Sequence, residues 1–152
     1  MEAGMEAEQR VARASRVIER PAADIFEQIA DPALQPAWDG NDNLSRAEPG
    51  QRVRAVGDVF VMTTTKARER HNHVVEFEEG RRIAWCPAEP GGEPLGHLWR
   101  WELRPLDDSR TEVTHTYDWT DLQDESRVPR ARATTAERLR ASLDRLALHV
   151  GG

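Results

Sequence analysis

The sequence predicts an α+β fold, in which a seven-stranded curved antiparallel sheet surrounds one long C-terminal helix and two short helices lie between the first and second strands. Three observations predict it. From Leu44 to Trp119 hydrophobicity repeats every two residues and is interrupted by turn residues, which is typical of antiparallel strands. Residues 23–30 carry apolar side chains at helical spacing, and residues 136–150 do so over a longer stretch.

Composition indicates one domain. A chain of 152 residues is the ordinary size of a domain with a single core. Residues 1–9 have no apolar period and are expected to form a flexible tail, so the domain is expected to span residues 10–152. Acidic and basic residues are mixed and the formal net charge is -6, which speaks against DNA as a partner.

The sequence also predicts a cytoplasmic protein. Cys86 is the only cysteine, so no internal disulfide can form. The N-terminal residues are polar and lack the apolar run of a secretory signal, and no stretch approaches the ~18 apolar residues of a membrane span. No membrane insertion is expected, and a homodimer is left open.

Turn residues divide the chain into its elements. The first strand is expected at residues 11–19, and Pro21 suits the start of the first short helix. Proline limits the second short helix to a turn or two before Trp38. The last helix begins either at a capping box of Thr134 and Glu137 or earlier, near Pro129. The remaining strands are expected at residues 44–48, 56–65, 69–78, 82–87, 95–105 and 110–120.

One face of the last expected hairpin is aromatic. Side chains two residues apart share a face of a strand, so Leu95, His97, Trp99, Trp101 and Leu103 lie together, as do Val113, His115, Tyr117 and Trp119. A turn centred near residue 108 then pairs Trp101 with His115, Trp99 with Tyr117, and His97 with Trp119.

The preceding hairpin is expected to add its own inner face. The same alternation groups His71, His73, Val75 and Phe77, followed by Ile83 and Trp85 after the turn. A bulge at Gly80 would exchange the inner and outer faces of one of these strands relative to the other. The apolar stripe of the last helix, which includes Leu139 and Leu143, is the expected cover, and a single helix under seven strands favours a cavity.

The order of elements and four segments resemble the START-like helix-grip (SRPBCC) superfamily, and within it the polyketide cyclase/dehydrase branch. These segments are SRVIERPAADIFEQIADPALQPAW at 15–38, VGDVF at 56–60, VVEFEEGRRIAW at 74–85 and LRASLDRLALHV at 139–150. The resemblance implies a deep cavity between sheet and last helix, used for lipids, sterols, polyketides or plant hormones. Some members are cyclases, others carry ligand, and others act through protein or ribosome contacts, so fold alone does not choose a function. The long connection at residues 87–96 is a candidate lid.

Three residues are candidates for acid/base chemistry: His115 as the acid/base, Tyr117 as a donor to a substrate oxygen, and His97. The alternative is that they are hydrogen-bonding groups of the cavity wall. No metal is expected, because an intervening strand separates His71 and His73 from the other two histidines. The acidic loop at residues 39–44 also lacks the glycine and the closing glutamate of a calcium site. No cofactor is expected, since no phosphate loop or nucleophile elbow is present.

The sequence therefore predicts a protein that binds a hydrophobic, cyclic, lipid- or polyketide-like molecule. Two alternatives stay open: a cyclase or dehydratase that uses His115 and Tyr117, and a protein- or ribosome-interaction module with a vestigial cavity. The candidate ligand-binding residues are Trp38, His71, His73, Val75, Phe77, Trp85, His97, Trp99, Trp101, His115, Tyr117, Trp119, Leu139 and Leu143.

Overall fold

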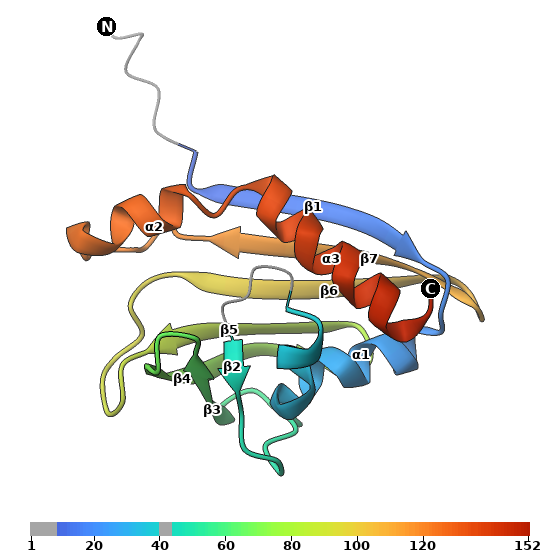
Figure 1. The fold of residues 1–152 in the computed structure, drawn as a ribbon, viewed down its shortest axis with the longest axis horizontal. Helices are drawn as coiled ribbons and strands as arrows, with labels where there is room; N and C mark the ends of the chain where they lie inside the picture. Colours follow the sequence, from blue (N-terminus) through green and yellow to red (C-terminus); the bar gives the residue numbers. More distant parts are fainter. Residues whose placement is uncertain (1–8, 40–43) are drawn as a thin grey trace, which may run out of the picture.

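The computed structural model describes residues 9–39 and 44–152 (Figure 1). Residues 1–8 of the expected tail and residues 40–43 of the acidic loop lie outside this range. The elements, in chain order, are β1 (Val11–Ile18), α1 (Ala22–Ala30), the 3₁₀ helix η2 (Pro32–Ala37), β2 (Leu44–Arg46), β3 (Val59–Thr64), β4 (Glu69–Glu78), β5 (Arg82–Ala88), β6 (Leu98–Asp107), β7 (Arg110–Asp118), the 3₁₀ helix η3 (Glu125–Arg127), α2 (Val128–Arg132) and α3 (Ala136–Val150).

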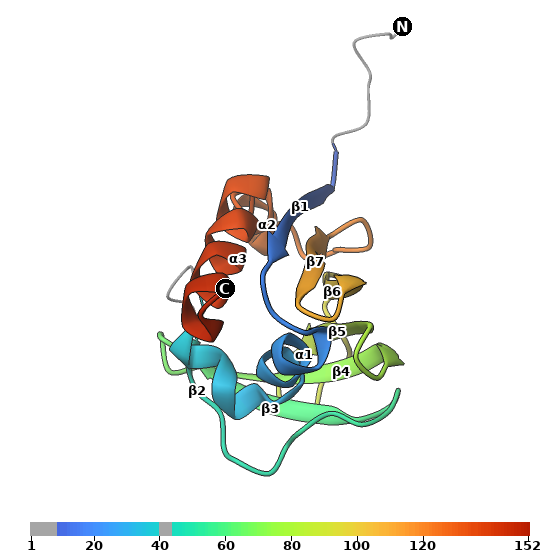
Figure 2. The ribbon, with the colours of Figure 1, turned by 90° about the vertical axis from the view of Figure 1, so that its right-hand side faces the viewer.

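The seven strands form one antiparallel sheet in the order β1-β7-β6-β5-β4-β3-β2. The first and last strands are therefore neighbours, and α1 with η2 carries the chain from one edge of the sheet to the other. The sheet curves around the helices, as Figure 2 shows. This confirms the predicted helix-grip architecture.

Helix α3 begins where Thr135 caps it: the Thr135 hydroxyl accepts a hydrogen bond from the backbone N–H of Arg138 at 3.4 Å. The predicted cap at Thr134 is therefore wrong by one residue, and the alternative start near Pro129 marks the separate short helix α2. Gly151 ends α3 in the left-handed region at φ 79°. Between these ends, α3 packs on β1 and β7 rather than across the middle of the sheet.

Packing of α3 at one side leaves the other side of the curved sheet uncovered by it. The fully buried Leu139, Leu143 and Leu146 fill the space between α3 and the sheet. Among the described residues, no helix combines the length and the apolar character needed to cross a membrane.

A β-bulge in β4 reverses part of the predicted inner face. The register with β5 shifts between Val74 and Glu76, so Val75 has no partner. Before the bulge, Asn72 and Val74 are buried, with 4% and 2% exposed. His71, His73 and Val75 therefore face outward, and their predicted place inside the sheet is wrong. The bulge lies five residues before Gly80, the position at which the sequence left a bulge open.

Candidate functional site

A cavity of about 190 Å³ lies between the curved sheet and the segment that runs from η3 to α3. Four groups of residues line it. Gln35, Trp38, Asp39 and Leu44 come from η2, the loop after it and β2. Met62, Thr64, Arg70 and Asn72 come from β3 and β4; Trp85, Pro87, His97, Trp99, Trp101, His115, Tyr117 and Leu122 come from β5, β6, β7 and the loops beside them; Arg127, Arg130, Ala131, Thr134, Arg138 and Ser142 come from η3, α2 and α3.

Six ring-bearing side chains form one wall of the cavity, which we call the aromatic floor: Trp38 after η2, Trp85 on β5, Trp99 and Trp101 on β6, and His115 and Tyr117 on β7. The Trp101 and His115 rings lie parallel with centroids 3.6 Å apart, and the Trp99 and Tyr117 centroids are 4.4 Å apart. Both pairs are cross-strand neighbours in the β6–β7 ladder, which confirms the predicted register. Trp38 closes one end of the floor, edge-on to Trp101 at 5.4 Å.

His115 is held as a neutral ring. Its Nδ1 lies 3.1 Å from the carbonyl oxygen of Arg100, and because a carbonyl only accepts, Nδ1 must carry the hydrogen. Nε2 is then left as a hydrogen-bond acceptor. Burial lowers the pKa of His115 to about 3, so the ring stays uncharged at neutral pH.

Tyr117 and His97 are neutral as well. Burial raises the pKa of Tyr117 to about 12, so its hydroxyl keeps its hydrogen and can donate. Burial, followed by the charges of nearby arginines, lowers the pKa of His97 to about 4. The Nδ1 atom of His97 is buried without a hydrogen-bond partner among the described residues. A ligand oxygen or N–H could supply that partner.

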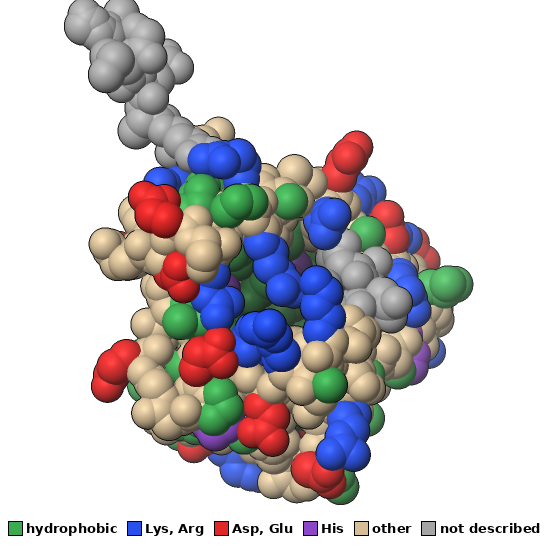
Figure 3. Space-filling view, turned by 60° about the vertical axis from the view of Figure 1, so that its left-hand side comes forward, with side chains coloured by type: hydrophobic (Ala, Val, Ile, Leu, Met, Phe, Trp, Pro, Cys, Tyr) green, Lys and Arg blue, Asp and Glu red, His purple; other side chains and the backbone are tan. Residues whose placement is uncertain are grey.

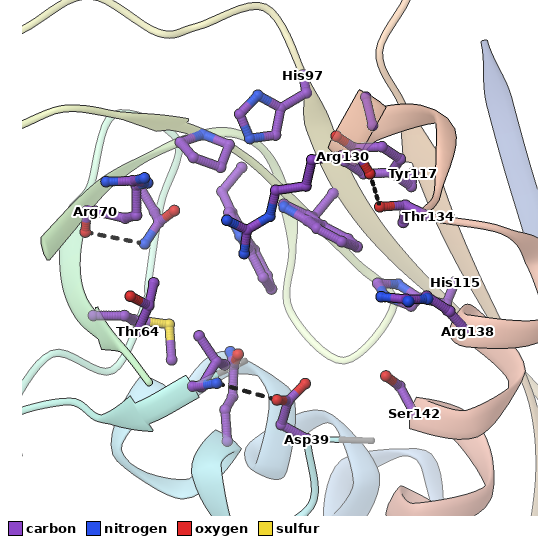
Figure 4. A pocket seen from close by; sticks show the side chains of 18 of the residues that line it. Asp39, Thr64, Arg70, His97, His115, Tyr117, Arg130, Thr134, Arg138 and Ser142 are labelled. Carbon is purple, nitrogen blue, oxygen red and sulfur yellow. Dashed lines mark hydrogen bonds between the residues drawn. The ribbon is translucent and has the colours of Figure 1, made fainter. Parts of the chain in front are cut away.

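Four arginines surround the mouth of the cavity, and we call Arg70, Arg127, Arg130 and Arg138 the arginine rim. Figure 3 shows Arg and Lys side chains around a hollow with a hydrophobic interior. In Figure 4, Arg130 reaches toward the middle of the cavity, with Arg70 and Arg138 on opposite sides.

Glu89 is the internal counterion of the rim. It pairs with Arg127 at 2.7 Å and with Arg70 at 3.3 Å. Because Glu89 belongs to the long connection at residues 87–96, these pairs fasten that connection to both sides of the mouth. Gly96, at φ 112°, closes against the backbone of Asp121, where a Cβ would lie 2.2 Å from the carbonyl oxygen. The candidate lid is therefore held in place at Glu89, by ion pairs, and at Gly96, by close backbone packing.

Seven of the predicted ligand-binding residues line the cavity: Trp38, Trp85, His97, Trp99, Trp101, His115 and Tyr117. The other seven do not. Phe77 packs edge-on against Phe26 in the core. Trp119 and Leu139 belong to a second buried cluster, and Leu143 is fully buried on the side of α3 that faces the sheet. His71, His73 and Val75 face outward because of the bulge.

The structure adds polar residues that the sequence reasoning missed. Arg138 and Ser142 are four residues apart on one face of α3, whereas Arg130 belongs to α2 and Thr134 lies between the two helices. The spacing of Arg138 and Ser142 was a usable signal in the sequence. Arg70 and Asn72 were missed because alternation across an unrecognised bulge assigned them to the outer face. Among the described residues, no group of three or more His, Cys, Asp or Glu side chains could hold a metal ion.

Comparisons with known proteins identify related chains. The family model described as polyketide cyclase / dehydrase and lipid transport matches residues 9–151. Uncharacterized protein Rv0088 of Mycobacterium tuberculosis is 30% identical over 115 residues, which cover 70% of this chain and 47% of that protein. The chain therefore spans about half the length of the curated relatives it matches.

Solved structures share the architecture. A protein from Thermobifida fusca, solved by NMR, superposes with a TM-score of 0.67 at 20% identity over 94% of each chain. A point mutant of norcoclaurine synthase from Thalictrum flavum, solved in complex with a transition-state analogue, gives a TM-score of 0.62 at 15% identity over 92% of each chain. At such identities the likeness shows the fold alone.

Proposed function

Because the chain belongs to the polyketide cyclase/dehydrase and lipid transport family, we propose that it binds a small hydrophobic molecule with a cyclic body in the cavity above the aromatic floor. The family and the fold indicate a hydrophobic ligand. The cyclic body is inferred from one observation: four tryptophans, with the rings of His115 and Tyr117, line the same cavity. Flat faces of this kind favour a flat ligand that stacks on them.

The size of the cavity supports a ligand of one or two rings. An apolar protein cavity of about 150 Å³ is known to take benzene. The cavity here is about 190 Å³ and opens at the arginine rim, so a larger molecule could extend outward. A cavity of this size also argues against the interaction-module alternative, which requires the interior to be filled by side chains.

The ionisation of the floor favours binding over catalysis. A proton shuttle works best with a pKa near the working pH. Burial holds the pKa of His115 at about 3 and that of Tyr117 at about 12, far on either side of neutrality. Both groups therefore serve as fixed hydrogen-bonding partners that orient a ligand oxygen or N–H.

A cyclase or dehydratase reaction is the second candidate, and one observation favours it. The Nδ1 atom of His97 is buried and has no hydrogen-bond partner within residues 9–39 and 44–152, and its ring lies beside Tyr117, with the two ring centroids 5.9 Å apart. Buried polar atoms left unsatisfied are common where a substrate completes the bonding. Turnover of a polyketone-like substrate that disappears in His115→Ala or His97→Ala would support this candidate, and binding without turnover would exclude it for that substrate.

A fluorescence titration tests the binding proposal. The neutral two-ring compound 2-naphthamide should quench the emission of the tryptophans in the floor. Trp99→Ala should weaken this binding about tenfold, because stacking on a large aromatic face is lost. Trp119→Phe is the matched control, since Trp119 is 3% exposed and does not line the cavity.

Two outcomes decide the proposal. Binding that weakens in Trp99→Ala and persists in Trp119→Phe supports it. Equal weakening in both variants would show that the probe reports general loosening of the core. Native mass spectrometry of the purified protein complements the titration, because a co-purified ring compound would identify the ligand class directly.

A further inference from the structure

We infer that the ligand is an amphipathic anion, whose ring body occupies the cavity and whose carboxylate or phosphate group is held at the mouth by the arginine rim. This inference rests on the proposed function and specifies the chemistry of its ligand. Its first support is the location of charge. The whole chain has a formal net charge of -6, yet the mouth of its cavity gathers four arginines.

Few carboxylates offset the rim. Asp39 is the only acidic residue that lines the described cavity. Glu89, beside the mouth, pairs with Arg70 and Arg127. Asp124 also lies 3.4 Å from Arg127, so the carboxylates that pair with the rim among the described residues gather at Arg70 and Arg127 and do not reach Arg130. Partly desolvated walls strengthen the field of such a charge, which raises the local concentration of anions.

Arg130 is the rim residue best placed to meet a ligand. Its side chain is exposed and points from α2 toward the middle of the cavity in Figure 4. Among the described residues, no carboxylate forms an ion pair with it. An arginine fork without a carboxylate partner matches the geometry of a carboxylate or phosphate, which it can bind through two parallel hydrogen bonds.

The positive charges of the rim arginines also repel one another. Burial lowers the pKa of Arg70, pairing with Glu89 opposes this effect, and the charges of Arg127 and Arg130 lower the pKa further. A bound anion would relieve that repulsion. The neutral His97 lies beside Tyr117 of the floor, with ring centroids 5.9 Å apart, so one ligand can meet hydrogen-bonding groups and charge in the same cavity.

Matched probes test the inference. The probes are 2-naphthoic acid and 2-naphthamide, which share a ring system and differ in charge at neutral pH. The acid should bind about tenfold more tightly, as expected for a charge-assisted hydrogen bond. Arg130→Gln with Arg138→Gln should abolish most of this preference and leave the amide unaffected. The Arg138 substitution keeps the cap of α3, because the cap uses the backbone N–H.

Arg145→Gln is the matched control, since Arg145 is an exposed residue of α3 that does not line the cavity. It removes one positive charge and should keep the preference for the acid. 2-Naphthyl phosphate then separates the two anion classes: tighter binding than the acid indicates a phosphate ligand, and weaker binding indicates a carboxylate. Either result supports an anionic ligand.

The failures are distinguishable. Equal binding of acid and amide would overturn this inference while the proposed function stands. A preference that falls equally in Arg145→Gln and in the rim variant would show a general effect of net charge, and would overturn the role of the rim. If none of the three naphthyl compounds binds, both this inference and the proposed function fail.

Discussion

The aromatic floor and the arginine rim of the same cavity differ in almost every physical respect. The floor residues are mostly buried, ring-bearing and neutral, and the backbone pairing of β5, β6 and β7 fixes the register of all of them except Trp38. The rim residues Arg130, on the short helix α2, and Arg138, in the first turn of α3, are exposed and charged. Floor residues therefore contribute both to the free energy of unfolding and to ligand affinity. Substitutions in the rim, in contrast, can change which ligand binds without changing the fold.

The largest effect on stability is expected when a floor residue is removed. Trp101 is 3% exposed and packs between Trp38 and His115. Trp101→Ala should lower the free energy of unfolding by about 3 to 5 kcal/mol, because a large buried side chain leaves a cavity. Urea denaturation measures this loss. A loss below about 1 kcal/mol would show that Trp101 acts as ligand contact and contributes little to the core.

The pH dependence of the free energy of unfolding tests whether His115 in the floor is neutral in the folded protein. His115 has a pKa of about 3 in the folded state, against about 6.5 in an unfolded chain. The unfolded state therefore takes up the proton first, and stability falls as the pH drops from 6.5 toward 3. Between pH 7.5 and 5, His115 alone should account for about 2 kcal/mol.

The variant His115→Asn isolates this contribution, because an amide can keep the hydrogen bond to the Arg100 carbonyl and does not titrate. Its unfolding free energy should fall about 2 kcal/mol less than that of the natural protein over the same pH range. The exposed His149, changed to Asn, is the control and should leave the slope unchanged. Parallel slopes for all three proteins would mean that His115 is protonated or accessible in the folded state.

The floor was largely predictable from the sequence, and the reason is local. A two-residue period with a short turn near residue 108 leaves one register for β6 and β7, so the neighbours of Trp101 and Trp99 followed directly. In β4 the same period failed. The extra residue at Val75 shifts the pairing with β5, and nothing in the alternation of HNHVVEF marks where such a bulge falls.

The rim was less predictable because it depends on tertiary position. The alternation of leucines and arginines on α3 predicted which side is buried. It did not show that α3 lies to one side of the sheet, over β1 and β7. That displacement turns the stripe of Arg138 and Ser142 toward the cavity, whereas a central helix would have presented Leu139 and Leu143 there.

Glu89 offers a way to sharpen the rim side of the comparison. Its carboxylate competes with any ligand anion for Arg70 and Arg127. Glu89→Gln should therefore tighten binding of 2-naphthoic acid about threefold, in line with the strength of a partly exposed ion pair. The exposed Glu93 on the same connection, changed to Gln, is the control and should have no effect. Weaker acid binding in Glu89→Gln would show instead that Glu89 positions the two arginines for the ligand.

The smallest effect is expected outside both regions. His71 and His73 face away from the cavity, on the outer side of β4, and His71 lies 3.4 Å from Glu69 there. The double variant His71→Ala/His73→Ala should leave the affinity for 2-naphthamide unchanged and shift the unfolding free energy by less than about 0.5 kcal/mol each. Titration and urea denaturation measure the two quantities. Because the bulge at Val75 alone decides which face these side chains occupy, a clear loss of probe binding would place them inside and contradict the register of β4 and β5.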